Sequence, residues 1–146
     1  MRSPDKALRQ AEREGLCSVS NNTKWRRLLT AIQGFPCNKR IKWIDSDEPS
    51  GWQVGMWQPH PNYVEASGGP EELKFIEWIE IERCERRQMG RLVQATFLDH
   101  TDLIRDALDS ERVTYEATEK SFRILGYTRP HTKTEEAQQD GTSNGG

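Results

Sequence analysis

Two groups of carboxylates are the residues in this sequence that could most directly do chemistry. They are Asp45, Asp47 and Glu48, and Glu77, Glu80 and Glu82. A pair of such side chains can act as general acid and base or hold a divalent metal. Neither group is linked by spacing to a histidine or a nucleophile, and turn formation explains the first group equally well. A small metal-dependent hydrolase or nuclease using Asp45, Asp47, Glu77 or Glu80 therefore stands as an alternative.

Aromatic residues gather between the two acidic groups. Trp43, Trp52 and Trp57 are followed closely by His60 and Tyr63. Large aromatic side chains beside loops are typical of protein–protein contact surfaces, but they also fill the space between a sheet and its helices. We expect Trp52, Trp57, His60 and Tyr63 to mark a contact surface and Trp43 to be buried.

The remaining reactive residues indicate no cofactor and no metal site. Cys17, Cys37 and Cys84 form no Cys-x-x-Cys pair, so free thiols are expected rather than a disulfide framework or a zinc site. His100 stands where a helix should begin, which explains it without catalysis. The sequence has no phosphate-binding glycine loop and no nucleophile elbow. We lean towards a protein that is not an enzyme.

Charge alternates along the chain although the net charge is only −2. Residues 1–44 hold ten Lys and Arg against three Asp and Glu, whereas residues 45–82 hold one against nine. Nucleic-acid binding through the basic third is a further alternative. Its candidate residues are Lys24, Arg26, Arg27, Lys39, Arg40 and Lys42. We favour instead a folded state in which the basic third lies against the acidic middle.

Periodicity and turn residues predict the elements that would position these side chains. Trp25, Leu28, Leu29 and Ile32 recur at helical spacing behind a cap at Asn21 or Asn22, and Gly34 ends that helix. Further helices are expected at about 4–14 and 101–110. Strands are expected at 39–45, 52–57, 74–82, 92–98, 113–117 and 122–127, with a long polar loop at 59–70 and a charged connection at 84–90.

This order predicts an α+β fold, with a mostly antiparallel sheet of four to six strands and two or three helices packed mainly on one face. In the strand at 74–82, Phe75, Glu77, Ile79 and Ile81 should share one face, leaving Glu80 and Glu82 near the surface. Residues 1–21 are expected to form an arm or short helix, 22–130 a single domain, and 131–146 a disordered tail. No run is apolar enough to span a membrane, which favours a cytoplasmic protein.

Three segments carry a resemblance to a known family. They are 22–29, 78–81 and 122–130, and together they resemble a family of small bacterial proteins with no assigned function. The resemblance implies no catalytic residues. In size and style the domain is also similar to immunity proteins of bacterial toxin systems.

The leading hypothesis is a protein-binding module, immunity-like or regulatory. Its binding surface would contain the four aromatic residues named above together with Glu80 and Glu82. Because acidic side chains steer positively charged partners, we expect the partner to be a protein with a basic surface.

Overall fold

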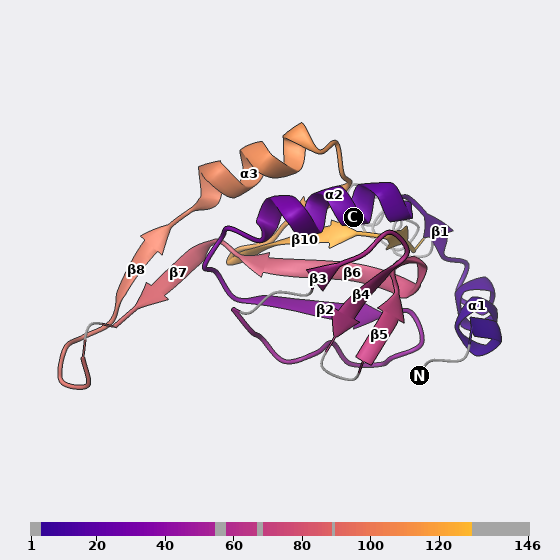
Figure 1. The fold of residues 1–146 in the computed structure, drawn as a ribbon, viewed down its shortest axis with the longest axis horizontal. Helices are drawn as coiled ribbons and strands as arrows, with labels where there is room; N and C mark the ends of the chain where they lie inside the picture. The colour runs from indigo at the N-terminus through magenta and orange to yellow at the C-terminus, as the bar shows by residue number, and fades with distance from the viewer. Residues whose placement is uncertain (1–3, 55–57, 67–68, 89, 130–146) are drawn as a thin grey trace, which may run out of the picture.

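A four-stranded antiparallel sheet forms the centre of the computed structural model, which describes residues 4–54, 58–66, 69–88 and 90–129 (Figure 1). The strands follow the order β2–β6–β10–β9. Their bounds are Lys39–Trp43 for β2, Ile76–Glu82 for β6, Tyr115–Ala117 for β9 and Ser121–Leu125 for β10. The predicted α+β class with a mostly antiparallel sheet is confirmed.

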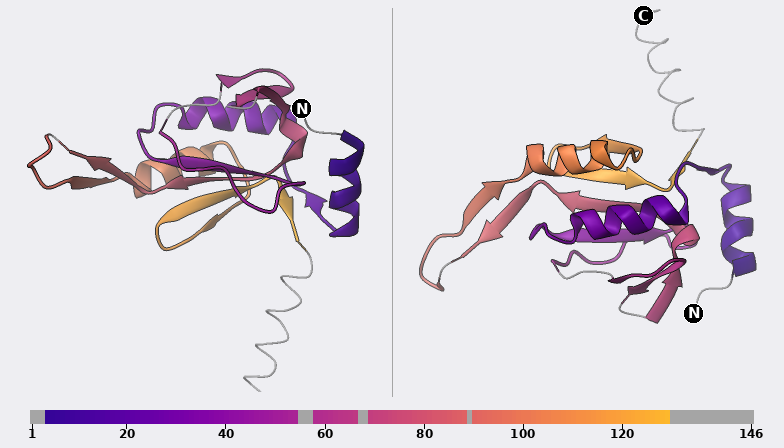
Figure 2. Two further views of the ribbon diagram at one scale, coloured as in Figure 1. Left: turned by 90° about the horizontal axis from the view of Figure 1, so that it is seen from below. Right: turned by 45° about the horizontal axis from the view of Figure 1, so that its top comes forward.

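Two helices, α2 (Asn22–Ile32) and α3 (Thr101–Ser110), lie over the same face of this sheet (Figures 1 and 2). The side chain of Asn21 accepts a hydrogen bond from the Lys24 backbone N–H and so caps α2. The apolar side chains of α2 and α3 pack into one core with those of the sheet. The buried helical residues are Trp25, Leu28, Leu29 and Ile32 on α2, and Ile104 and Leu108 on α3.

Strand β6 presents two different faces. Ile79 pairs with Ile41 and Ile124 on the core side, while Glu80 pairs with Arg40 and Arg123 on the other side. The predicted strand starts two residues too early, because a short 3₁₀ turn, η1 (Leu73–Phe75), precedes β6.

The prediction for Glu77 was wrong, because the register shifts between Lys42 and Trp43. Lys42 pairs with Trp78, whereas Trp43 pairs with Ile76, so Glu77 is an extra residue on β6. A bulge of this kind breaks the strict alternation of side chains. The Glu77 carboxylate therefore reaches Lys42 on the Trp78 side rather than joining Ile79 and Ile81.

Smaller elements surround the central sheet. Helix α1 and the pair β1–β11 lie at one end, β3–β4–β5 form a three-stranded antiparallel sheet, and β7–β8 form a hairpin. Their bounds are Pro4–Arg13 (α1), Cys17–Ser18 (β1), Gln58–Pro59 (β3), Tyr63–Ala66 (β4), Gly69–Glu72 (β5), Cys84–Arg87 (β7), Thr96–Asp99 (β8) and Tyr127–Thr128 (β11). Figure 1 shows the hairpin projecting from the end of the molecule opposite α1.

Several predicted connections proved to be structured. The expected polar loop at 59–70 contains most of the three-stranded sheet, whose Val64 is completely buried, and the charged connection at 84–90 contains β7. Conversely, the strand predicted at 52–57 is reduced in its described part to a single bridge between Gln53 and Lys39. The strand predicted at 92–98 begins only at Thr96.

The N-terminal residues contact the rest of the molecule. Ala7 on α1 is fully buried in the core, and β1 pairs antiparallel with β11 near the other end of the described chain. The predicted tail at 131–146 lies outside the described residues. In the part of the chain that the structure describes, every helix is too short or too polar to cross a membrane.

Candidate functional site

The face of the central sheet opposite α2 and α3 carries a hollow of about 780 Å³. Its residues come from β2, β6, β9, β10 and β11, and from the turn after β2. Asp47, Glu48 and Glu116 line it with exposed side chains. The hollow therefore has acidic residues at its edge and the strands of the sheet beneath it. We call this region the open face.

Alternating tryptophan and arginine side chains cross the open face. Trp78 on the central strand is flanked by Arg40 and Arg123 on the neighbouring strands, with guanidinium carbons 5.7 Å and 4.2 Å from the centre of its ring. Arg40 also lies 4.4 Å from the ring centre of Trp52. Each contact is a cation–π interaction, which favours a fixed arrangement of these planar groups.

A buried carboxylate holds the two arginines in place. Glu80 is only 3% exposed, and its Oε1 accepts a hydrogen bond of 2.7 Å from Arg40 Nε. Its Oε2 accepts one of 2.9 Å from Ser121 Oγ and lies 3.5 Å from Arg123 Nη2. Because a buried charge needs such partners, Glu80 organises the open face rather than meeting solvent.

Glu77 forms a second buried network beside the first. Its carboxylate accepts a hydrogen bond of 2.7 Å from Lys42 Nζ and two of 2.9 Å from Arg129. Arg129 also pairs with Glu14, which follows α1. The hydrogen bonds that Arg129 donates to Glu77 contribute most to raising the pKa of Arg129 above its ordinary value, and the hydrogen bond that Arg129 donates to Glu14 lowers the pKa of Glu14.

The predicted contact residues that the structure describes do not form one surface. Trp52 is 40% exposed and lies at the end of the tryptophan–arginine row. His60 and Tyr63 stack on each other, with ring centres 4.4 Å apart, on the separate β3–β4–β5 sheet. Trp57 lies outside the described residues.

The two glutamates assigned to the contact surface are not free acids. Glu80 was expected near the surface, and that expectation was wrong because it is buried between Arg40 and Arg123. Glu82 is partly buried, and its carboxylate accepts a hydrogen bond of 2.8 Å from Asn38. Trp43, expected to be buried, is 9% exposed and belongs to the core.

The carboxylates of the hydrolase alternative do not assemble into a metal site in the described residues. No group of three or more His, Cys, Asp or Glu side chains there could hold a metal ion. Glu77 and Glu80 already accept hydrogen bonds from cations, which compete with any metal for their oxygens.

The six basic residues of the nucleic-acid alternative do not share one surface. Lys24, Arg26 and Arg27 belong to α2, whereas Arg40 and Lys42 point to the open face and pair with glutamates. Lys39 is fully buried, and its Nζ donates hydrogen bonds to the carbonyls of Phe35, Cys37 and Val54. Burial lowers the pKa of Lys39.

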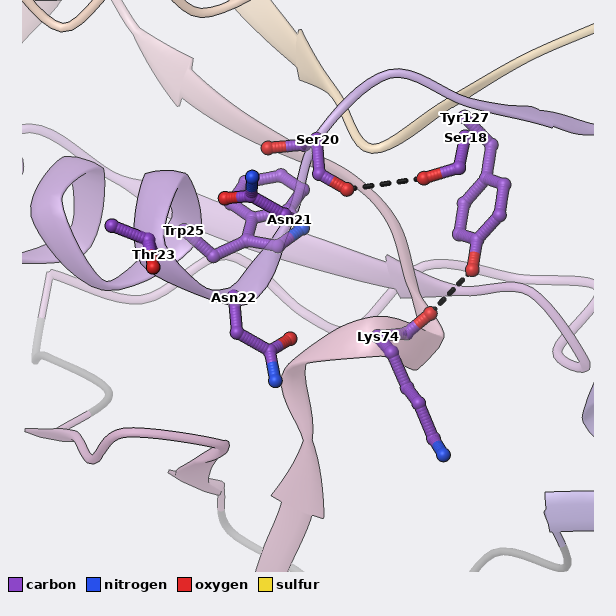
Figure 3. Close-up of a pocket in the computed structure, with 8 residues that line it drawn as sticks. All are labelled: Ser18, Ser20, Asn21, Asn22, Thr23, Trp25, Lys74 and Tyr127. Carbon is purple, nitrogen blue, oxygen red and sulfur yellow. Dashed lines mark hydrogen bonds between the residues drawn. The ribbon is translucent and has the colours of Figure 1, made fainter.

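A second, smaller hollow of about 430 Å³ lies at the start of α2 (Figure 3). Polar residues before and in the first turn of α2 line it, together with Trp25, Lys74 and Tyr127. Ser18 Oγ donates to the Ser20 carbonyl, and Tyr127 Oη donates to the Lys74 carbonyl, as the dashed lines in Figure 3 show. The second bond links β11 to η1, and β1 pairs with β11, so these three segments meet beside the start of α2.

Sequence reasoning missed Trp78, Arg123 and Arg129 as members of a site. Each lies on a predicted strand or just after one, but only the pairing of β6 with both β2 and β10 brings them together. The available signal was the basic character of 39–42 and the acidic character of β6, which predicted that these segments lie against each other.

Comparison with known proteins identifies a family for this chain. No curated protein and no solved structure matches the chain. One family model matches residues 7–131, which include every described element except the first residues of α1. The chain therefore belongs to a family of unknown function, DUF6678.

Proposed function

We propose that this protein is a protein-binding module and that the open face is its binding surface. The observation that supports the proposal most is the Trp52–Arg40–Trp78–Arg123 row beside a hollow of about 780 Å³. Tryptophan and arginine are enriched among the residues that contribute most to protein–protein affinity. The two arginines are held by hydrogen bonds to the buried carboxylate of Glu80, which reduces the side-chain entropy lost on binding.

The charges of the open face favour a particular kind of partner. Glu77 and Glu80 are already paired with cations, whereas Asp47, Glu48 and Glu116 are exposed around the hollow. A partner segment that places an apolar or aromatic side chain in the hollow, with Lys or Arg beside it, would satisfy both features. We therefore propose a partner protein with a basic contact surface.

Capture of partners from the native cell tests this proposal. The wild type should retain a partner that Trp52→Ala loses, because the substitution removes an exposed aromatic ring without opening the core. Tyr63→Ala is the matched control, because Tyr63 is similarly exposed but lies on the β3–β4–β5 sheet. Identical partner sets for the wild type and Trp52→Ala would contradict the proposal.

A narrower proposal concerns biological role. An immunity-like or regulatory factor in the bacterial cytoplasm would act through such a surface by covering part of another protein. This role rests on similarity of size and style, and the gene neighbourhood tests it. A toxin gene directly beside this one would support the role, and a set of neighbourhoods without any toxin gene would contradict it.

A further inference from the structure

The β7–β8 hairpin and helix α3 expose an unusual amount of apolar surface. Among the described residues, nine large hydrophobic side chains are exposed, and five of them lie in this region. They are Leu92, Val93, Phe97, Leu98 and Leu103. Within the described residues β7 and β8 form a separate two-stranded sheet, and such a ribbon is marginally stable alone in water. A covering partner would stabilise it.

Charge divides this region into two complementary halves. Residues 83–88 and 90–98, which we call the arm, contain four arginines and one glutamate. Residues 99–111, which contain α3, hold five acidic residues and one arginine. The arm is therefore strongly basic and the helix strongly acidic within the same chain.

The acidic side chains of α3 also gather on one side of the helix. Asp102, Asp106 and Asp109 are exposed and are spaced by four and three residues, so they share one face. Leu103, which is 60% exposed, lies beside that face. On the arm, Arg86 and Phe97 form a directly opposed pair, so a basic and an apolar side chain share one face of the ribbon.

We propose that the arm and α3 form a reciprocal interface between two copies of this chain. Strand β8 leads into α3 through His100 alone, so the two elements follow each other directly (Figure 1). Two copies aligned in opposite directions place the arm of each beside α3 of the other. The lengths match, since ten helical residues span about 15 Å and four strand residues about 14 Å. The resulting contact is isologous, as in a twofold dimer.

A second copy fits this surface better than an unrelated protein because both complementary halves belong to one chain. The contact between a basic arm and an acidic helix occurs twice in the dimer, once for each arm, and the exposed leucines and Phe97 are covered between them. The interface is separate from the open face, whose residues come from other strands. Failure of the dimer would therefore leave the proposed binding function unaffected.

Sedimentation or light-scattering measurements of mass on the full chain test the dimer. The wild type should be a dimer whose dissociation constant rises with salt, because salt shortens the screening length from about 10 Å at 0.1 M to about 3 Å at 1 M. Arg86→Glu/Arg91→Glu in the arm, or Asp102→Arg/Asp106→Arg in α3, should each raise that constant by about tenfold or more. Lys6→Glu/Lys24→Glu is the matched control for charge and should leave the dimer intact.

Mixing the arm variant with the α3 variant, whose charges are both reversed, tests the dimer most sharply. In the mixed pair, an acidic arm meets a basic helix and a basic arm meets an acidic helix, so a heterodimer should form from two weakly associating variants. This recovery also shows that both variants remain folded. A wild type that stays monomeric, a dimer insensitive to both reversals, or a mixture without recovery would each overturn the proposal.

Discussion

Cys37 and Lys39 show how strongly this small core constrains individual polar residues. Both are fully buried, and the Lys39 ammonium group donates to the Cys37 carbonyl over 2.9 Å. Burial raises the pKa of the Cys37 thiol to about 11. At neutral pH this thiol is therefore both inaccessible and almost entirely protonated, and the thiolate is the reactive form.

Thiol labelling should separate the three cysteines. At pH 8 in the folded protein, Cys17 and Cys84 should react rapidly, because they are exposed, and Cys37 should not. Cys37 should become reactive only when denaturant is added. Mass spectrometry of peptides after a short labelling pulse checks this expectation, and rapid native labelling of Cys37 would contradict the burial.

Gly126 is a second residue that its surroundings constrain, because they leave no space for a side chain. A Cβ atom at this position would lie 2.4 Å from the Ile76 carbonyl oxygen and 2.8 Å from the Trp25 ring. The Gly126 N–H also donates to the Glu77 carbonyl over 2.7 Å, so the backbone cannot easily move away.

Replacing Gly126 by alanine should therefore lower the free energy of unfolding by about 1–3 kcal/mol through overpacking. Gly34→Ala is the matched control, because a Cβ there meets nothing within 4 Å. Urea unfolding of both variants measures the difference. Equal stability of Gly126→Ala and the wild type would show that Trp25 and β6 pack more loosely than described.

At the scale of elements, the helices and strands predicted best are those with clear local signals, such as a capping residue or regularly spaced apolar residues. Helix α2 has an Asn cap and four core residues at helical spacing, and α3 and β10 also lie close to their predicted positions. The bulge at Glu77 and the strands at 58–72 escaped prediction for different physical reasons. The bulge depends on the register between β2 and β6, and the short strands lie among turn-forming residues that mask their pairing.

The attachment of α1 is an element-scale feature that responds to pH. The hydrogen bond from Arg129 lowers the pKa of Glu14 below its ordinary value of 4.5. The folded state thus holds this proton less tightly than the unfolded state does. The contribution of Glu14 to stability is complete above pH 4.5 and is lost as the pH falls through the lowered pKa of the folded state.

Substituting Glu14 by glutamine tests this contribution. The variant should be less stable than the wild type at pH 7, and its free energy of unfolding should fall less steeply with acid below pH 4.5. Glu12→Gln, at an exposed position of α1, controls for removal of one carboxylate. Equal acid dependence of Glu14→Gln and the wild type would contradict a role for the Glu14–Arg129 pair.

At the scale of the whole molecule, the basic and acidic segments that alternate along the sequence form ion pairs with each other in the folded chain. Arg40 and Lys42 from the basic first third pair with Glu80 and Glu77 from the acidic middle, as the sequence predicted. This pairing explains how the chain can bury the carboxylates of Glu77 and Glu80. It also removes these residues from the surfaces that sequence reasoning assigned to them.

The candidate site was less predictable than the fold. Trp52 was proposed from the sequence because large aromatic residues beside loops are typical of contact surfaces, whereas Trp78, Arg123 and Arg129 become neighbours only through long-range strand pairing. Glu80 was placed at the surface because residue type alone does not reveal that two arginines and a serine surround it. Local sequence patterns therefore predict the helices and strands, whereas the register between paired strands determines which side chains meet in the candidate site.

Site-specific photo-crosslinking in the native cell tests the central claim most directly. A photoreactive amino acid at position 52 should crosslink a distinct protein, because this position lies at the exposed end of the tryptophan–arginine row. The same group at position 30, on an exposed site of α2 over the opposite face of the sheet, should not capture that protein. A protein crosslinked from 52 and absent from 30 is the predicted result. Equal capture from both positions, no protein from position 52, or nucleic acid in its place would contradict the open face as a protein-binding surface.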